Sequence, residues 1–205
     1  YEKNRTGNKF MKKICFITLA LVCALAAIAA VRLSGPGAIH NMAGTPGKRG
    51  YSGDKEDALY ARLSNPMGIA LDRWNNIYIA DTRNHRVRRI DVRSGDIDTV
   101  AGTGKPGFTN DGGSGEQAAL NGPTALAFDK IGNLYIADTG NQRIRLLDVR
   151  GRLHTVAGNG RRGYEGEGSR ALVSALNNPT GIAISRAGEL YIADTGNNRI
   201  RKVDR

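Results

Sequence analysis

The chain has 205 residues, of which 40% are hydrophobic, so it can bury a core, and wholesale disorder is excluded. Its 27 glycines follow no three-residue period, which excludes a collagen-like chain and favours short strands joined by tight turns. The formal net charge of +11 favours anionic partners such as nucleic acid, acidic glycans or lipid headgroups, and identifies none of them.

The N-terminal part has the pattern of a targeting segment. Met11 and two lysines precede an apolar run that ends in small residues, MKKICFITLALVCALAAIAAV at 11–31, as is typical of a secretory signal peptide. We expect residues 1–10 to be non-native upstream readthrough, residues 11–30 a signal peptide and residues 31–36 a linker. An uncleaved membrane anchor over residues 14–31 is the alternative, because this run just reaches spanning length. We therefore expect an extracytoplasmic protein, periplasmic or secreted.

Cysteine chemistry is confined to the same segment. Both cysteines, Cys15 and Cys23, lie in the apolar run. The sequence after residue 36 therefore predicts no disulfide framework, no zinc–thiolate site and no cysteine nucleophile.

From residue 37 onward an internal repeat dominates the sequence. Residues 65–91, 122–148 and 178–204 align without a gap, so that positions such as Asp81, Asp138 and Asp194 recur at a nearly constant spacing. The connecting segment repeats as well, since DTVAGTGKPGF at 98–108 matches HTVAGNGRRGY at 154–164. A weaker copy, HNMAGTPGKRGY, occupies residues 40–51. Such a period indicates a repeat architecture.

Each unit predicts four short strands in chain order. The first is an apolar run after a proline, at Gly68–Leu71, Ala125–Phe128 and Gly181–Ile184. The second is at Ile77–Ala80, Leu134–Ala137 and Leu190–Ala193. The third is polar on one face, at Arg86–Asp91, Arg143–Asp148 and Arg199–Asp204. The fourth is at Ile97–Ala101 and Leu153–Ala157, with Ile39–Ala43 as a weaker copy. Four strands joined by hairpins describe a β-propeller blade.

These residues resemble the NHL repeat family. The matching motif is P-x-G-I-A followed by N-L-Y-I-A-D-T-G-N-x-R-I-R-x-x-D, which recurs in register over residues 37–205. The long glycine-rich connections are similar to those of bacterial exported members. The resemblance implies an all-β fold, a β-propeller of four-stranded blades with about three blades present. Because propellers close with four or more blades, we expect an incomplete fragment, in which missing blades or self-association would be needed for closure.

The candidate site is the face on which the loops leaving the second and fourth strands lie, because loops on a rigid scaffold carry function. The repeated Asp–Asn–Arg turns could present donors to carboxylates, phosphates or peptide backbone. The candidate binding residues are Arg83, Asn84, His85, Arg86, Asn141, Arg143, Asn197 and Arg199. The alternative is structural, because Asp and Asn favour tight turns and the same residues recur in every blade.

Position 83 breaks the repeat, since the other copies have Gly140 and Gly196, for which we expect a positive φ. Arg83 joins His85 and Arg86, followed by two more arginines, in a basic cluster that could contact an anionic ligand. The alternative is a solvated strand face. Nucleic acid is not expected as a partner, because no stacking aromatic residues accompany these arginines and the protein is expected to be exported.

The sequence offers few residues that could form a metal site or a catalytic site. Acidic residues in the long connections could bind calcium but show no fixed spacing; they are Asp54, Asp111, Glu165 and Glu167. His40, His85 and His154 lie at non-equivalent blade positions, so convergence on one zinc ion is not expected. No hydrolase, zinc-protease or phosphate-loop motif occurs. We therefore predict no catalytic residue, no metal and no cofactor.

Two functions remain open. The first, which we favour, is an exported scaffold that binds a protein, peptide or glycan through its loop face. The second is an extracytoplasmic metal-dependent lyase or lactonase-like hydrolase, with catalytic residues outside this fragment, because related propellers include such enzymes. The discriminating feature is a set of His, Glu or Asp residues that differ between blades and point into the channel.

Overall fold

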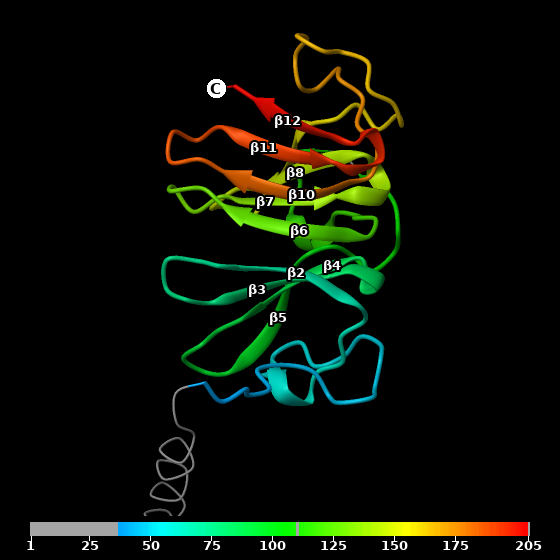
Figure 1. Cartoon of the computed structure of the whole chain (residues 1–205). Helices are drawn as coiled ribbons and strands as arrows, with labels where there is room; N and C mark the ends of the chain where they lie inside the picture. Colours follow the sequence, from blue (N-terminus) through cyan, green and yellow to red (C-terminus); the bar gives the residue numbers. More distant parts are fainter. Residues whose placement is uncertain (1–36, 110, 205) are drawn as a thin grey trace, which may run out of the picture. The chain divides into compact units, whose positions relative to one another are not determined.

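The computed structural model describes residues 37–109 and 111–204 (Figure 1). The expected readthrough segment, signal peptide or anchor, and linker, at residues 1–36, lie outside the described residues. The chain divides into two compact units, Tyr1–Asn41 and Met42–Arg205. Of the first unit, residues 37–41 are described, and they form no helix or strand. In the described part of the chain, no helix has the length and apolarity needed to cross a membrane.

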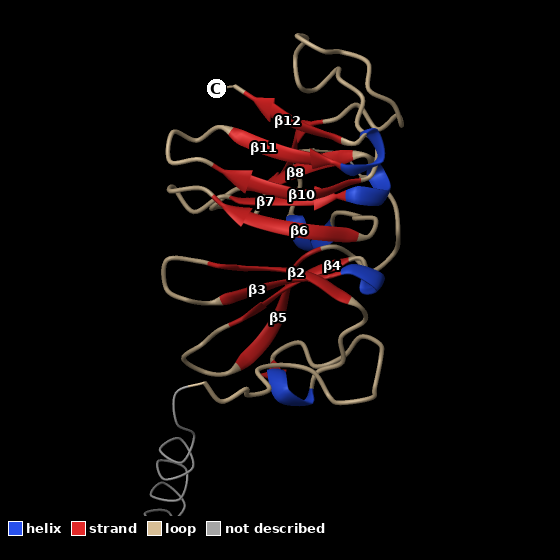
Figure 2. Ribbon diagram, viewed as in Figure 1, coloured by secondary structure: helices blue, strands red, loops and turns tan. Residues whose placement is uncertain are grey.

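Three antiparallel sheets follow one another along Met42–Arg205 (Figure 2). The first has the order β1-β5-β4-β3-β2 and contains β1 (Glu56–Asp57), β2 (Pro66–Leu71), β3 (Ile77–Asp81), β4 (Arg86–Ile90) and β5 (Asp96–Ala101). The second is formed in sequence order by β6 (Pro123–Phe128), β7 (Leu134–Asp138), β8 (Arg143–Leu147) and β9 (Leu153–Ala157). The third contains β10 (Pro179–Ile184), β11 (Leu190–Asp194) and β12 (Arg199–Val203). These are blades 1, 2 and 3, which confirms the predicted all-β fold with about three propeller blades.

Two details of the strand prediction need correction. Blade 1 gains a fifth strand, because β1 pairs with the outer strand β5 in the register Glu56↔Ile97 and shields that edge. The fourth strand expected at Ile39–Ala43 is not formed. In blades 1 and 2 a fourth strand pairs with the third strand of its own blade, and the described residues before Ile39 supply no such partner.

Short 3-10 helices connect the strands. In each blade one of them follows the second strand: η2 (Thr82–Asn84), η4 (Thr139–Asn141) and η5 (Thr195–Asn197). The other two, η1 (Ala58–Tyr60) and η3 (Gly115–Gln117), lie in the long connections that lead into blades 1 and 2. They let the chain reverse direction within three residues, which keeps the blade turns short.

The predicted positive φ at the turn glycines is wrong. Gly140 and Gly196 do not have a left-handed backbone; that conformation falls two residues later, at His85, Gln142 and Asn198, with φ of 52°, 55° and 52°. A 3-10 turn is built from right-handed residues, so the left-handed residue is the one that ends it. The glycines therefore need another explanation, which their packing provides.

The core lies between neighbouring blades, which stack with β2 beside β6 and β6 beside β10 (Figure 1). Between blades 1 and 2, Val87, Leu120 and Leu126 are buried, and between blades 2 and 3 the core contains Ile144 and Leu176. One face of each strand packs on the next blade because side chains alternate along a strand. Because neighbouring strands of a blade are antiparallel, the loops that leave the second and fourth strands lie at the same end of the strands, termed the loop face.

Candidate functional site

The loop face is organised around one buried aspartate in each blade. Asp81 accepts a hydrogen bond from the Ser64 N–H at 2.7 Å and another from the Asn84 side-chain amide at 2.7 Å. Asp138 and Asp194 repeat both bonds at the same distances in their blades. All three aspartates are fully buried. Each one therefore joins its own turn to the chain segment that enters the blade.

The asparagines of these turns also hold the long connections. Asn84 Nδ2 donates to the Gly50 carbonyl at 2.6 Å. Asn141 and Asn197 make the same contact, in each case at 2.7 Å, with the carbonyls of Gly107 and Gly163. These contacts bring each connection next to a blade turn and occupy the amide donors of the asparagines within the fold.

Arginines at the start of the third strands stack on aromatic rings from the connections. The guanidinium carbon of Arg86 lies 3.9 Å from the centre of the Tyr51 ring, and that of Arg143 lies 4.0 Å from the Phe108 ring. Arg199 lies 4.9 Å from the Tyr164 ring. The expectation that no aromatic residues accompany the arginines of this face is therefore wrong. The three rings recur with the spacing of the blades, so the repeat alone could have revealed them.

The arginines also donate to backbone carbonyls. Arg86 donates to Gly102 at 2.8 Å and to Thr103 at 2.7 Å. Arg143 donates to Asn159 at 2.9 Å, and burial lowers the pKa of its guanidinium. Each arginine thus fixes the start of the following connection while one face of its aromatic ring is covered.

A second row of arginines is buried beneath the first. Arg88 and Arg145 are fully buried, so the interpretation of this strand face as solvated is wrong. Arg88 forms salt bridges of 2.6 Å with Asp54 and 3.8 Å with Asp81. Arg145 forms salt bridges of 2.8 Å with Asp111 and 3.4 Å with Asp138. Burial raises the pKa of Asp138 to about 6, although Asn121, Asn141 and Arg145 all act to lower it.

The acids of the connections have a fixed spacing after all. Asp54, Asp111 and Glu167 recur with the spacing of the blades, and each pairs with the second arginine of the third strand that follows it. In the third blade the partner is Arg201, 3.5 Å from Glu167. This register is visible only when one acid is chosen from each connection, because Glu165 has no equivalent acid in the other two. In the described structure these acids are counter-ions of arginines.

Residues after the turns tie neighbouring blades together. His85 Nδ1 accepts a hydrogen bond from the Gly122 N–H at 3.0 Å, and burial lowers the pKa of this histidine. In the next blade, Gln142 Oε1 accepts from the Asn178 N–H at 2.6 Å. The same position therefore serves as an inter-blade acceptor in both blades, by two different side chains.

The eight predicted residues lie in the three turns after the second strands and at the first residue of each third strand, so they form three separate groups, one in each blade. Arg83 and Arg199 are exposed, while the other six are partly buried and largely engaged within the fold. Their role in ligand binding stays a prediction. None of the eight predicted residues comes from the long connections that contact these turns.

The connections also present partly exposed groups. Tyr51, Phe108 and Tyr164 are 42%, 43% and 59% exposed. Three residues before each ring stands an exposed cation, at Lys48, Lys105 and Arg161. Among the residues that the structure describes, none of these three cations forms a salt bridge. Residues 47–51, 104–108 and 160–164 are termed the aromatic–cation loops.

The stacked blades and their repeated turns define a β-propeller built from repeats. The family model described as NHL repeat matches residues 63–90 and 176–203. Blades 1 and 3 of this chain therefore contain NHL repeats. The matched segments cover the first three strands of blades 1 and 3.

Curated relatives are much longer than this chain. It is 32% identical to protein SUPPRESSOR OF QUENCHING 1, chloroplastic, of Arabidopsis thaliana, over 69% of this chain and 14% of the relative. It is 31% identical to NHL repeat-containing protein 2 of Homo sapiens, over 70% of this chain and 21% of the relative. The chain therefore spans only a small part of either relative.

Solved structures share the blade arrangement. A structural genomics protein of unknown function from Bacteroides thetaiotaomicron superposes with a TM-score of 0.60 at 26% identity, covering 72% of this chain and 38% of that chain. An auxiliary nutrient binding protein from Bacteroides ovatus superposes with a TM-score of 0.55 at 28% identity, covering 69% and 37%.

Proposed function

We propose that this chain is an exported NHL-repeat propeller that acts as a binding scaffold, and that its aromatic–cation loops take an acidic glycan. One observation carries the proposal. Each of the three loops presents a partly exposed ring and an unpaired cation at the same register, so the loop face offers a periodic surface. A polymer of acidic sugars likewise repeats flat rings and negative charges along its length.

The chemistry of each loop fits a sugar acid. An aromatic ring offers a flat apolar face on which the C–H face of a sugar can stack. The neighbouring Lys or Arg can pair with the carboxylate of the same unit. The guanidinium beneath each ring holds it in place before binding, which reduces the ordering cost on association.

Two further observations support a binding role. The Bacteroides auxiliary nutrient binding proteins that superpose on the chain at 27% and 28% identity carry a ligand-binding role in their names. The sequence of residues 11–30 favours export. An exported protein can encounter extracellular glycans. A protein or peptide ligand is the alternative and would use the same exposed rings.

The enzyme alternative lacks a supporting observation. Among the described residues, no group of three or more His, Cys, Asp or Glu side chains could hold a metal ion. A metal-dependent lyase or hydrolase therefore stays a prediction about residues beyond those the structure describes. A scaffold function needs only the surface that the described blades present.

Binding to polygalacturonate by isothermal titration calorimetry tests the proposal. We expect saturable binding that weakens as salt rises, and no binding of the fully methyl-esterified polymer, which keeps the sugar rings and lacks the charge. Lys48→Gln, Lys105→Gln and Arg161→Gln combined should weaken binding by about tenfold or more. The matched control removes three exposed cations from the opposite end of the strands, by Arg93→Gln, Lys130→Gln and Arg186→Gln.

The control separates a site from a general charge effect. Equal weakening by both triple variants would mean that net charge alone attracts the polymer. Binding of the methyl ester at the same affinity would contradict the role of the cations. Tighter binding of a single-stranded RNA than of any glycan would assign the face to nucleic acid, because exposed rings and cations also stack and pair with nucleotides.

A further inference from the structure

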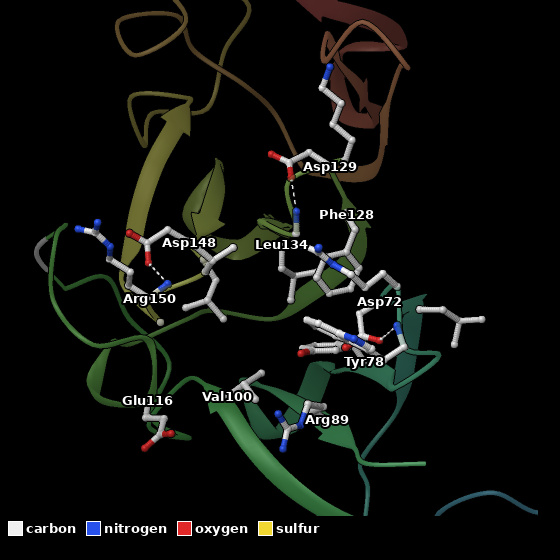
Figure 3. Close-up of a pocket in the computed structure, with 18 of the residues that line it drawn as sticks. Asp72, Tyr78, Arg89, Val100, Glu116, Phe128, Asp129, Leu134, Asp148 and Arg150 are labelled. Atoms are coloured by element: carbon white, nitrogen blue, oxygen red, sulfur yellow. Dashed lines mark hydrogen bonds between the residues drawn. The ribbon is translucent and has the colours of Figure 1, made fainter. Parts of the chain in front are cut away.

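A cavity of about 710 Å³ opens between blades 1 and 2, at the end of the strands opposite to the loop face (Figure 3). The turns after β2 and β6 form its rim, and residues from β3, β4, β5 and β7 line its interior. Its size lies within the range of about 300–1,000 Å³ that is typical of small-molecule sites. No step of the glycan proposal uses this cavity.

Aromatic side chains form one wall of the cavity. Tyr78 and Phe128 meet edge to face with ring centres 4.9 Å apart, and Trp74 lies at the rim. Arg73 stacks on Trp74 at 4.9 Å and donates to the Ile131 carbonyl of blade 2 at 2.6 Å. This contact fixes the rim across the two blades. A flat apolar ring can pack against such a wall.

Arg89 supplies a positive charge inside the cavity. It lies beside Val100 and opposite Tyr78 in the β3–β4 register (Figure 3). Its Nε is buried and has no hydrogen-bond acceptor, and among the described residues Arg89 forms no salt bridge. A buried donor without an acceptor is costly, so a ligand oxygen at this point would be favoured. Burial raises the pKa of Tyr78, although a hydrogen bond from the Arg89 side chain acts to lower it. The Tyr78 hydroxyl thus accepts from Arg89 and keeps its own proton as a second donor.

The acids of the turns do not supply that acceptor. Asp72 accepts from the N–H groups of Trp74 and Asn76, at 2.8 Å and 2.9 Å. Asp148 accepts from two backbone N–H groups and one side chain of its own turn. Asp129 accepts from three backbone N–H groups and one side chain of its turn. Glu116 is exposed, and no salt bridge joins it to Arg89 within the described residues. Asp98 stands opposite Arg89 in the β4–β5 register, and no salt bridge joins the two within the described residues. The charge of Arg89 is therefore not consumed by a salt bridge in this part of the chain.

The next pair of blades provides an internal comparison. The equivalent space between blades 2 and 3 encloses about 320 Å³. At the positions of Trp74, Arg89 and Phe128 the chain there carries aliphatic residues, Ile131, Leu146 and Ile184. The blade fold therefore requires neither the large rings nor the arginine. Their presence in the cavity between blades 1 and 2, termed the wedge, marks a local specialisation.

We infer that the wedge between blades 1 and 2 is a binding site for an aromatic carboxylate. The ring would lie against Tyr78 and Phe128 beneath Trp74, and the carboxylate would accept from Arg89 and the Tyr78 hydroxyl. This site is separate from the aromatic–cation loops and stands whether or not they bind a glycan.

Trp74 is the one tryptophan of the chain, so its fluorescence reports on the wedge directly. We would titrate the full chain with phenylacetate and with phenylacetamide, which has the same ring and no charge. Wild-type protein should show a saturable change in Trp74 emission, with phenylacetate binding about tenfold more tightly than the amide. Arg89→Leu copies Leu146 of the next blade and should remove that preference while amide binding is retained. Phe128→Ile copies Ile184 and should weaken both ligands.

Circular dichroism and thermal unfolding of each variant establish that it is folded, and the aliphatic residues of the next wedge show that blades accept them. Equal binding of phenylacetate and phenylacetamide by the wild type would overturn the proposal. So would unchanged phenylacetate binding by folded Arg89→Leu, or no saturable response of Trp74 at about 10 mM ligand.

Discussion

Ser64 explains why one blade turn carries an arginine where the other two carry glycine. A Cβ on Gly140 would lie 2.5 Å from Cγ of Asn121 and 2.7 Å from its carbonyl oxygen. A Cβ on Gly196 would lie 2.5 Å from Cγ of Asn177 in the same way. In blade 1 the equivalent of these asparagines is Ser64, which is smaller and leaves space for Arg83. The glycine is thus a packing requirement that depends on its neighbour.

Gly140→Ala should lower the free energy of unfolding by about 1–3 kcal/mol, because the new methyl group collides with Asn121. Adding Asn121→Ser, which copies the Ser64–Arg83 arrangement, should recover most of the loss. Urea unfolding of the two variants and the wild type measures both effects. A double variant no more stable than Gly140→Ala would contradict this explanation.

His85 should make stability depend on pH. Its pKa is lowered in the folded state, so below its ordinary value of about 6.5 the unfolded chain binds the proton more readily. The contribution of His85 is therefore complete above about pH 6.5 and is lost as pH falls through the folded-state pKa. His85→Gln copies Gln142, keeps an acceptor for the Gly122 N–H, and should remove this part of the pH dependence.

Urea unfolding of wild type and His85→Gln between about pH 7.5 and pH 5 gives the difference directly, because the other titrating groups are common to both. The wild type should lose more stability on acidification than the variant. Parallel curves would show that the hydrogen bond from Gly122 imposes no protonation constraint on His85.

Within each blade, salt bridges between the second arginine of the third strand and nearby acids stabilise the strand. In blade 2, Arg145 receives one carboxylate from the end of β7 and another from the connection. The connection is thereby fastened to the blade by a buried charge pair, in addition to the backbone contact of Asn141. Strand, turn and connection form one unit, which is why all three repeat with the same period.

Arg145→Met should destabilise the chain by about 3–5 kcal/mol, because it leaves Asp138 buried without its cationic partner. Arg152→Met is the matched control in the same blade. Its side chain is 49% exposed and pairs with Asp148, so its loss should cost no more than about 1 kcal/mol. Chemical denaturation measures both variants, and equal losses would show that Arg145 acts only through its aliphatic packing.

The repeat made the strands predictable, because every blade shows the same apolar runs between the same turns. It did not reveal the burial of Arg88, since the β4 sequence read by itself resembles a solvated basic strand. The deciding partner, Asp54, lies far earlier in the chain, in the connection that leads into blade 1. The cavity between blades 1 and 2 could not be predicted from the sequence either. Trp74 and Phe128 belong to different blades, and they line one cavity only because the blades stack.

At the scale of the whole molecule, the described blades expose faces that the repeat elsewhere buries. Ile200 is 73% exposed, whereas its equivalents Val87 and Ile144 are fully buried. Ile69 is 71% exposed, whereas its equivalent Leu126 is 7% exposed. The faces that cover Val87 and Leu126 are other blades, so blade-like surfaces are the natural cover for these residues.

The purified chain should therefore self-associate in a concentration-dependent manner, visible by sedimentation velocity. Ile69→Lys combined with Ile200→Lys should shift the distribution towards the monomer. Val149→Lys alters an exposed apolar residue in a turn, 64% exposed, and should leave association unchanged. A wild type that stays monomeric at all concentrations would show that the exposed faces are tolerated in solution.

Binding of the glycan by the aromatic–cation loops can be located by a hydrogen–deuterium exchange footprint. With saturating polygalacturonate, we expect slower exchange in residues 47–51, 104–108 and 160–164, and unchanged exchange in the opposite turns at 72–76 and 129–133. Protection confined to the opposite turns, or saturable binding with no protection in the three loops, would contradict it.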